Sequence, residues 1–356
     1  MHIPDGYLSP STCAVAYAVA LPFWYTGLRR MKRKLNSQVV PLLSVISAFS
    51  FVVMMFNLPI PGGTTAHAVG MGLAAIVLGP WAGLLAISIA LGIQALFFGD
   101  GGITAFGANS LNMGILGTFV AYGLYRLISS GASISSPRRV VAAAIAGYAA
   151  INAAALLAAL QFGIQPLLFT DAAGTPLYAP YPLSIAVPSM MVAHLTIAGL
   201  AEGIITAGVV AYLQRANPNL LKLTAGLSDT QAAAGWKGTR ALWAGLGAMM
   251  VASPLGLIAA GTAWGEWGVE DFQDAAMRTQ ISSASANIAP PAEVPQGLEH
   301  LSSIWTAPMP DYAPAFMHDA NFGYILSAVV GAGLIVVVCS FLSWFFGRGR
   351  QNRIAA

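Results

Sequence analysis

Residues 67–98 read HAVGMGLAAIVLGPWAGLLAISIALGIQALFF, and this stretch decides the topology of the chain. It contains no Asp, Glu, Lys or Arg, and Gly79-Pro80 interrupts it near the middle. Because proline breaks a helix interior, the stretch forms either one kinked element or two short spans, 67–79 and 82–98. A membrane helix needs about 20 apolar residues, so both halves would be short. The distribution of charged residues in the rest of the chain distinguishes between the two arrangements.

The composition establishes the class of protein. Charged residues make up 8% of the 356-residue chain, against about 25% in soluble domains, and apolar residues make up 57%. We therefore expect an all-α, polytopic membrane protein, and the net charge of +3 gives no indication of a nucleic-acid partner. Further spans are expected at 11–28, 38–57, 107–128, 139–163, 185–213, 240–262 and 322–346.

The basic residues favour two spans within 67–98. With nine spans and the N-terminus outside, fifteen of the sixteen Lys and Arg residues fall inside, and only Arg278 falls outside. Cytoplasmic segments of membrane proteins are enriched in Lys and Arg, so this distribution fixes the expected orientation. A single span at 67–98 would give an even number of spans, and the basic residues that follow it would then fall outside. The C-terminus is accordingly expected inside.

The spans divide into two groups. Residues 1–213 hold seven spans with short connections, 214–239 form a polar cytoplasmic linker, and 240–346 form a two-helix hairpin, followed by a cytoplasmic tail at 347–356. The hairpin encloses an outside loop, 264–321, which is rich in Ala, Ser and Pro and carries eight acidic residues. We expect this loop to be poorly ordered without a partner surface.

The first residues, Met1-His2-Ile3-Pro4-Asp5-Gly6, can form a compact metal chelate. Its donors would be the Met1 amine, the His2 backbone amide nitrogen and the His2 imidazole Nδ1. Such a planar, nitrogen-rich donor set suits Ni(II) or Cu(II). Pro4-Asp5-Gly6 is a turn signal that stiffens the segment. A disordered start that contains histidine by chance remains an alternative at this point.

His67 is the candidate for a fourth donor. It follows the Pro- and Gly-rich stretch 59–66 and opens the third expected span on the outer face, where the N-terminus also lies. A neutral imidazole can complete a four-nitrogen plane around the ion. The alternative is that His67 only caps the start of a helix.

Several polar residues are candidates to support these ligands. Metal-bound histidines usually donate their second N–H to a carboxylate or carbonyl oxygen, and Asp100 or Asn109 can supply one. Ionisable groups inside a span are costly and face an interior or a partner, although a purely structural role is an equal alternative. The supporting candidates are Asp100, Asn109, Thr64, His194 and Glu202. No nucleophile motif or phosphate-binding loop occurs in the sequence, so neither an enzyme nor a resident cofactor is expected.

These segments resemble a known family. Met1 to Gly6, the His67 loop, Gln94 to Gly102 and the run from His194 to Gly203 are similar to the CbiM/NikM substrate-binding components of energy-coupling-factor nickel and cobalt transporters. Residues 240–346 resemble the two-helix CbiN/NikN component. There Pro295-Gln296-Gly297-Leu298-Glu299 matches the family's Pro-Asp-Gly-Leu-Glu signature except at Gln296, and Pro310-Asp311-Tyr312 follows.

The resemblance implies a seven-helix substrate-binding component whose inserted N-terminus ligates the ion through Met1, His2 and His67. It implies a bacterial or archaeal cytoplasmic membrane and ATP-driven import, with a transmembrane coupling subunit and separate ATPase subunits as partners. Fusion of the two parts is commoner among nickel members, which favours Ni(II) as the transported ion. Import of Co(II) for cobalamin synthesis is the nearest alternative. A passive metal channel and an intramembrane metalloenzyme are the alternatives from other classes.

Overall fold

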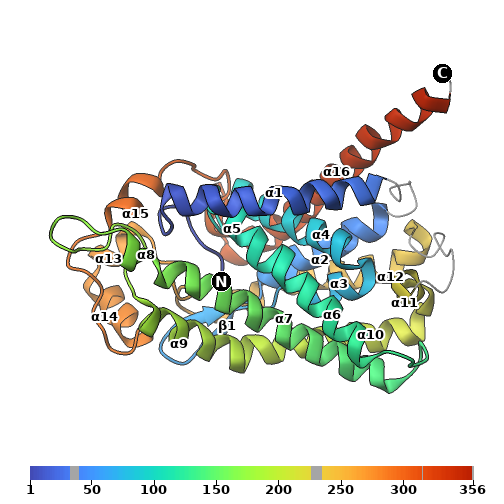
Figure 1. The fold of residues 1–356 in the computed structure, drawn as a ribbon, viewed down its shortest axis with the longest axis horizontal. Coiled ribbons are helices and arrows are strands. Elements are labelled where there is room, and N and C mark those ends of the chain that lie inside the picture. The colour runs from blue at the N-terminus through green and yellow to red at the C-terminus, as the bar shows by residue number, and fades with distance from the viewer. Residues whose placement is uncertain (33–39, 226–234, 315, 355–356) are drawn as a thin grey trace.

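The long uncharged runs form helices, because within a bilayer every backbone N–H and C=O must be paired inside its own segment. A computed structural model describes residues 1–32, 40–225, 235–314 and 316–354 of this elongated helical bundle (Figure 1). Within those ranges six helices are long and apolar enough to cross a membrane, and α2 is a shorter apolar helix. The prediction of an all-α, polytopic membrane protein is confirmed.

The first part of the chain starts at a capped helix. Ser9 Oγ accepts a hydrogen bond of 3.1 Å from the Thr12 amide, and Pro10 occupies the first helical position. The helices of this part are α1 (Pro10–Lys32), α2 (Val40–Met54), α3 (Met71–Leu78), α4 (Pro80–Ile93), α5 (Phe106–Asn109), α6 (Thr118–Ile128), α7 (Pro137–Gly163), α8 (Gln165–Leu168), α9 (Leu183–Ala193) and α10 (Gly199–Ala216). The predicted start of the second span, residues 38 and 39, lies outside the described residues.

Helices α3 and α4 are two elements that turn back on each other at Gly79-Pro80. A side chain at Gly83 would lie 3.2 Å from the backbone of Ala74, so the two helices pack closely on either side of the turn. The prediction that the third span is helical from residue 67 is wrong, because α3 begins at Met71 and covers only eight residues, about 12 Å.

The residues before α3 form a hairpin that the sequence did not reveal. Strand β1 (Leu58–Ile60) pairs antiparallel with β2 (Thr64–Ala66), with Pro59 opposite Thr65. Its turn uses Gly62 and Gly63 at φ values of 97° and 83°, a region that glycine adopts without strain. The hairpin carries the extended chain to His67, which therefore lies in a connection and does not start a helix.

Three membrane helices contain π-helical turns that include or lie close to candidate site residues. These turns are η1 (Gln94–Phe98) at the end of α4, η2 (Ser110–Gly117) between α5 and α6, and η3 (His194–Ala198) between α9 and α10. A π turn widens the helix locally and is frequent at functional sites. They adjoin Asp100, Asn109 and His194, three of the polar residues that the sequence singles out.

The second part of the chain packs its two long helices on α2, where Gly331 lies against the Phe51 ring. The outside loop between those helices is folded on a partner surface, the condition that the prediction of poor order left open. The elements of this part are α11 (Pro218–Ala225), α12 (Trp236–Ala252), the 3₁₀ turn η5 (Ser253–Ile258), α13 (Val269–Gln273), α14 (Ala275–Ala284), α15 (Gln296–Leu301), the 3₁₀ turn η6 (Pro310–Tyr312) and α16 (Ala320–Ile354). Helix α16 thus continues through most of the expected tail. The described parts of the expected linker are largely helical, in the end of α10, in α11 and in the start of α12.

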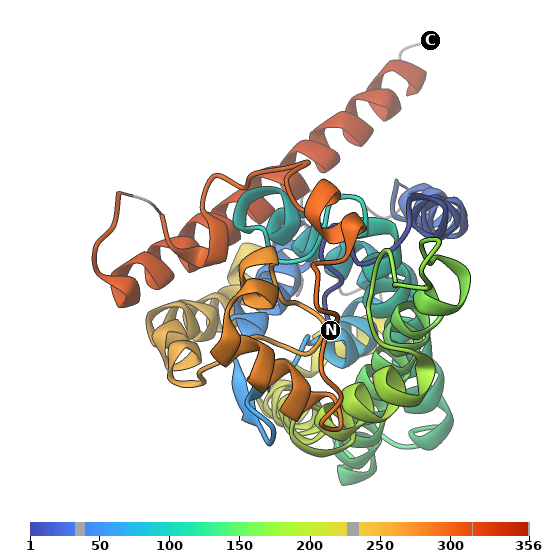
Figure 2. The same cartoon turned by 90° about the vertical axis from the view of Figure 1, so that its left-hand side faces the viewer.

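The loop is ordered because the first part of the chain supplies its partner surface. Gly297 donates a backbone hydrogen bond to Leu177, and Met309 donates one to Phe97. Trp305 Nε1 bonds the Leu96 carbonyl at 2.9 Å. Viewed from this end, α13 to α15 and their connections surround the N-terminus (Figure 2). Both parts of the chain therefore build one end of the molecule.

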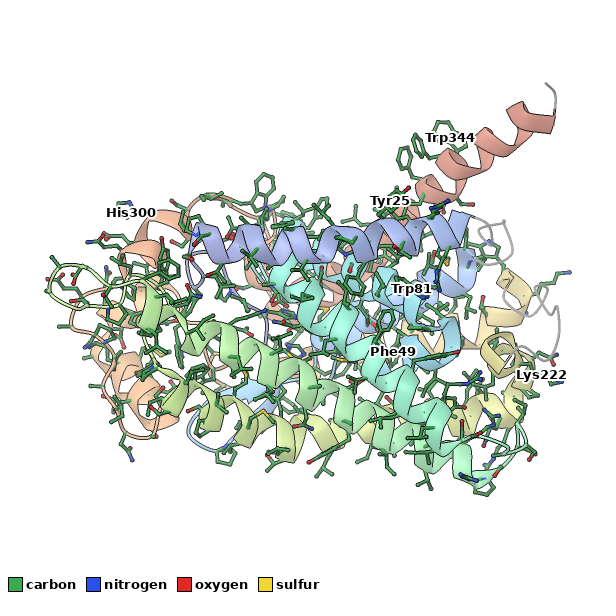
Figure 3. All side chains as sticks on the ribbon, viewed as in Figure 1. Tyr25, Phe49, Trp81, Lys222, His300 and Trp344 are labelled. Atoms are coloured by element: carbon green, nitrogen blue, oxygen red, sulfur yellow. The ribbon has the colours of Figure 1, made fainter. Side chains whose placement is uncertain are left out.

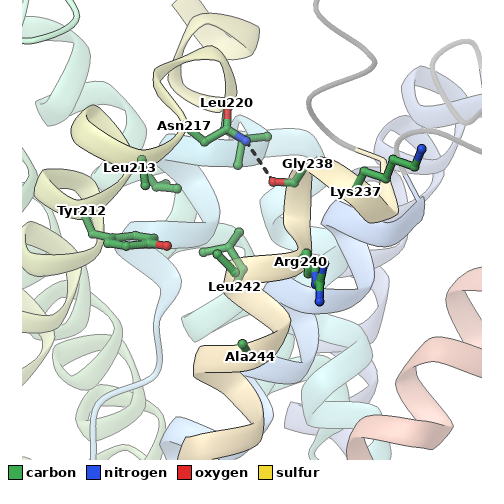
Figure 4. Close-up of a pocket in the computed structure, with 11 residues that line it drawn as sticks. Tyr212, Leu213, Asn217, Leu220, Lys237, Gly238, Arg240, Leu242 and Ala244 are labelled. Atoms are coloured by element: carbon green, nitrogen blue, oxygen red, sulfur yellow. Dashed lines mark hydrogen bonds between the residues drawn. The ribbon is translucent and has the colours of Figure 1, made fainter.

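The opposite end carries basic side chains. Lys222 lies there, far from His300 of the outside loop (Figure 3). A pocket of about 470 Å³ opens nearby between α10, α11 and α12, with Lys237 and Arg240 in its wall (Figure 4). Asn217 Nδ2 bonds the Gly238 carbonyl at 2.9 Å beside this pocket. None of the candidate metal ligands lines it.

Small residues allow α3, α7 and α10 to approach closely. A Cβ on Gly147 of α7 would lie 2.7 Å from Thr206 Oγ1 and 3.1 Å from the Glu202 carbonyl, both on α10. Membrane helices depend on such small contacts because lipid supplies little hydrophobic drive for helix association.

We therefore expect Gly147→Leu to force α7 and α10 apart and to destabilise the fold by about 1–3 kcal/mol, a typical cost of overpacking. The matched control is Gly208→Leu on α10, where a side chain would meet nothing within 4 Å. Thermal unfolding in detergent should show a lowered midpoint for Gly147→Leu alone. Equal midpoints for both variants would contradict this packing.

Candidate metal centre

The N-terminal segment lies inside the molecule. His2 and Ile3 have no exposed surface, and Met1 is 2% exposed. Chain termini are ordinarily exposed and poorly ordered unless they are held in place. The burial of a charged amine and an imidazole therefore requires specific partners, and these partners define the site.

The main chain of Ile3 is held from both sides by one amide side chain. Ile3 N–H donates to Asn109 Oδ1 at 2.9 Å, and Asn109 Nδ2 donates to the Ile3 carbonyl at 3.0 Å. The Gly102 amide adds a 2.8 Å bond to the same carbonyl. Buried backbone groups must be paired, so Asn109 and Gly102 fix the depth to which the chain enters.

The turn at Pro4-Asp5-Gly6 anchors the segment further. The Asp5 carboxylate accepts hydrogen bonds from the amides of Ile103 and Thr104, at 3.0 and 2.7 Å. Gly6 has φ of 88°, and a side chain there would lie 2.6 Å from the carbonyl oxygen of Gly297. The segment similar to the Pro-Asp-Gly-Leu-Glu signature thus packs on the N-terminal turn, which only glycine permits.

The His2 ring contacts Asp100, as the sequence suggested. His2 Nδ1 hydrogen-bonds Asp100 Oδ1, and Asp100 Oδ2 accepts bonds from Gln94 Nε2 and the Tyr312 hydroxyl. Burial opposes the charge on Asp100, but the His2 charge and hydrogen bond, with His67 and Tyr312, outweigh it and hold the pKa of Asp100 below its ordinary value. Asp100 is therefore a fixed anion beside His2.

His67 faces the His2 ring. The two ring centroids are 5.0 Å apart, and His67 is 5% exposed. His67 Nδ1 lies 3.0 Å from the Ala68 carbonyl, which makes Nδ1 the donor and leaves Nε2 with its lone pair. Burial, then the positive N-terminus and His2, lowers the pKa of His67 well below its ordinary value. The neutral form is the one that ligates a metal.

Glu202 of α10 positions the His67 connection. Its carboxylate accepts hydrogen bonds from the amides of Val69, Gly70 and Gly72, at 2.8, 2.8 and 3.0 Å. These amides open α3, where a helix has unpaired N–H groups and a partial positive charge. The buried Glu202 therefore acts through the backbone, two residues beyond His67, and has no direct contact with the His2 ring among the hydrogen bonds described.

The Met1 amine and the His2 amide share one acceptor. Met1 N donates to Glu266 Oε1 at 3.0 Å and His2 N donates to the same atom at 2.9 Å. Glu266 lies in the outside loop, 18% exposed at its side chain. The two main-chain nitrogens that the sequence predicts as metal donors thus point toward one position.

The supporting candidates differ in what they touch. Asp100 and Asn109 contact His2 and Ile3 directly, and Glu202 fixes the connection that bears His67. Thr64 lies in β2 opposite Ile60, and His194 Nδ1 bonds the Met190 carbonyl of its own helix at 2.8 Å. Neither Thr64 nor His194 has a hydrogen bond to Met1, His2 or His67 among those described.

Two residues of the site escaped the sequence analysis. Glu266 is one of eight acids in the loop, and only its setting, Trp264-Gly265-Glu266-Trp267-Gly268, distinguished it. Tyr312 belongs to the Pro310-Asp311-Tyr312 run but gave no sign of reaching Asp100. The described residues include no group of three or more His, Cys, Asp or Glu side chains that could hold a metal.

Comparison with known proteins identifies the family of the chain. The family model described as cobalt uptake substrate-specific transmembrane region, CbiM, matches residues 2–220, and the PDGLE domain model matches 239–348. The chain is a metal-transport membrane protein by this fold and these matches. It belongs to the CbiM family of nickel and cobalt transport proteins, with a PDGLE domain in the same chain.

The relatives include proteins of the same two-part construction. The fused nickel transport protein NikMN of Rhodobacter capsulatus is 61% identical over 94% of this chain and 95% of its own length. The probable fused nickel transport protein LarMN of Lactiplantibacillus plantarum is 41% identical over 95% and 96%. A crystal structure of a truncated transition metal transporter has a TM-score of 0.57 and 54% identity, covering 60% of this chain and 98% of its own.

We expect Asn109→Leu to weaken metal binding about 10–100-fold, the usual effect of removing a group that positions a ligand. The variant leaves the Ile3 main chain without its partners and loosens Met1 and His2. Asn112→Leu is the control, because it removes a buried amide that bonds Gln161 and not the N-terminus. Equilibrium nickel binding by both purified variants tests this expectation. An equal loss of affinity in both would contradict a specific role for Asn109.

Proposed function

We propose that this chain is the substrate-binding subunit of an ATP-driven energy-coupling-factor importer of Ni(II). The ion would be held by Met1 N, His2 N, His2 Nδ1 and His67 Nε2. The observation that carries the proposal is the convergence of a buried N-terminus with His67, whose ring centroid lies 5.0 Å from that of His2. Four nitrogens in this arrangement suit a square-planar ion.

The donor chemistry supports this assignment. Ligands must be deprotonated to bind, and His67 is buried and neutral beside the N-terminus. The His2 ring must reorient, since its Nδ1 now bonds Asp100 while the buried Nε2 has no hydrogen-bond partner among the described residues. With Nδ1 turned toward the amine, Asp100 remains beside the ring as an acceptor and as a counter-charge for the ion.

Nickel is preferred over cobalt as the substrate. A planar site with an amide nitrogen favours Ni(II), whereas Co(II) has less to gain from that geometry. The relatives that match about 95% of this chain carry nickel in their names, and a relative that matches 62% of it is named a cobalt transport protein. Cobalt import is therefore the second candidate.

The proposed assembly follows from what the chain would need for active import. The outside loop that carries His300 lies at the end opposite Lys222 (Figure 3), and from the positive-inside rule we infer that this end faces away from the cytoplasm. We infer a division of labour in which residues 1–213 bind the ion and the hairpin at 240–346 serves its loading or release. A transmembrane coupling subunit and ATPase subunits would supply the energy.

Elemental analysis and the ultraviolet-visible spectrum of the purified chain test the proposal directly. One tightly bound Ni(II) per chain, with the spectrum of a low-spin planar ion, is expected. Metal-dependent turnover by the isolated chain would instead favour an enzyme, and the absence of stoichiometric binding would contradict the proposed function.

Insertion of one Ala between Met1 and His2 should lower nickel affinity by orders of magnitude. The extra residue enlarges the chelate and moves the amine away from the imidazole. Binding is measured by competition with a chromophoric chelator, with circular dichroism as the check on folding. An unchanged affinity and stoichiometry would exclude the chelate.

His67→Ala should also abolish tight binding, because the plane loses its fourth nitrogen. His67→Asn should bind nearly as poorly, since an amide oxygen is a weak donor for planar Ni(II). His300→Ala, on the exposed surface of α15, is the matched control. A bound-nickel spectrum identical to that of the unmodified protein in either His67 variant would refute its role as a ligand.

A further inference from the structure

The turn around Glu266, residues 263–267, is fixed on both sides of the candidate metal centre. Ala263 forms a parallel bridge to Thr65 of β2, two residues before His67. At its other end, the Trp267 carbonyl accepts a 2.8 Å hydrogen bond from the Tyr7 hydroxyl. The Glu266 turn therefore joins the hairpin that carries His67 to the segment that carries His2.

The turn itself is tightly packed. Trp264 is 6% exposed and donates to Ser285 Oγ at 3.1 Å, and Trp267 is 2% exposed. Gly265 has φ of 82° and packs against the Phe162 ring, where a Cβ would lie 3.1 Å away. Glu266 is consequently held against the N-terminus by its surroundings and has little freedom to point elsewhere.

The Glu266 contact and metal chelation exclude each other. The His2 amide donates its proton to Glu266 Oε1 at 2.9 Å. Once that nitrogen ligates a metal, it has no proton left to donate. The Met1 amine also directs its lone pair to the ion instead of presenting all its N–H groups to the carboxylate. The carboxylate oxygen thus lies where the two nitrogens would meet the ion.

We propose that Glu266 is a built-in competitor of the transported metal, through which the hairpin lowers the affinity of the site and speeds release of the ion. This inference rests on the proposed function. Because coupling is reciprocal, metal binding weakens the docking of the Glu266 turn by the same factor that the turn weakens metal binding. The hairpin therefore senses whether the site is loaded.

If Glu266 were a metal ligand, it would raise the metal affinity of the site instead of lowering it. Asp100 bonds the imidazole of His2 and neither of the two main-chain nitrogens. Glu266 instead bonds the N–H groups of both main-chain donors, which are the protons that chelation must remove. The geometry is that of a group displaced by the ion.

The test compares the full chain with Glu266→Gln and Glu266→Ala. Glu293→Gln, at an exposed acid of the same loop, is the matched control. We expect nickel affinity, measured with NiCl₂ against a chromophoric chelator, to rise about tenfold in the Ala variant and less in the Gln variant, which keeps a neutral acceptor. Loss of nickel to excess chelator should slow in the same order, and Glu293→Gln should match the unmodified chain.

Every other outcome overturns the inference. A lower affinity in Glu266→Gln would make Glu266 a ligand or a support for the ion, and an unchanged affinity would make its contact incidental. If the unmodified chain binds nickel in a manner that needs Met1, His2 and His67, such results leave the proposed function standing. If the unmodified chain binds no nickel, both the function and the inference fail.

A second measurement needs no variant. Hydrogen exchange of residues 263–268 in the unmodified protein should become faster when nickel is added, because displacement of Glu266 frees the turn. The Asn217–Gly238 contact (Figure 4), at the end of the molecule that carries Lys222, reports on any general change through exchange of the helices around it. Equal protection of the turn with and without nickel would overturn the inference even if the variants do not fold.

Discussion

The insertion of the N-terminus is the constraint on which the rest of this structure depends. Met1 and His2 have almost no exposed surface, so their charge and their main-chain groups must be paired inside the protein. Asn109 and Gly102 pair the Ile3 main chain, and Glu266 pairs the amine. Each partner lies on a different segment, and so the insertion links α5, the turn after η1 and the outside loop.

The same constraint explains why the outside loop is folded. Its sequence is poor in large apolar residues relative to the spans, and by itself it has little core to form. It obtains that core from the first part of the chain, where Trp267 meets Tyr7, Gly297 meets Gly6 and Tyr312 meets Asp100. The two parts thus meet around the candidate metal centre, in a chain related to nickel and cobalt transport proteins.

Much of the fold could be predicted because the bilayer imposes strict rules. Uncharged runs must form helices, so the helices in the described parts of the chain lie close to the predicted spans, apart from the late start of α3. The exceptions share a cause. The hairpin at 58–66 and the non-helical stretch at His67 are short, and their backbone groups are paired by distant partners such as Glu202, which no local pattern reveals.

The candidate site divides in the same way. The sequence by itself determined that Met1, His2 and His67 have suitable donor chemistry, because chelate ring size depends only on the order of bonded atoms. Only the tertiary structure decided that Glu266 meets both main-chain donors and that Tyr312 reaches Asp100. Those contacts join residues more than 200 positions apart, and their geometry follows from how the loop packs on the helices and not from any spacing along the chain.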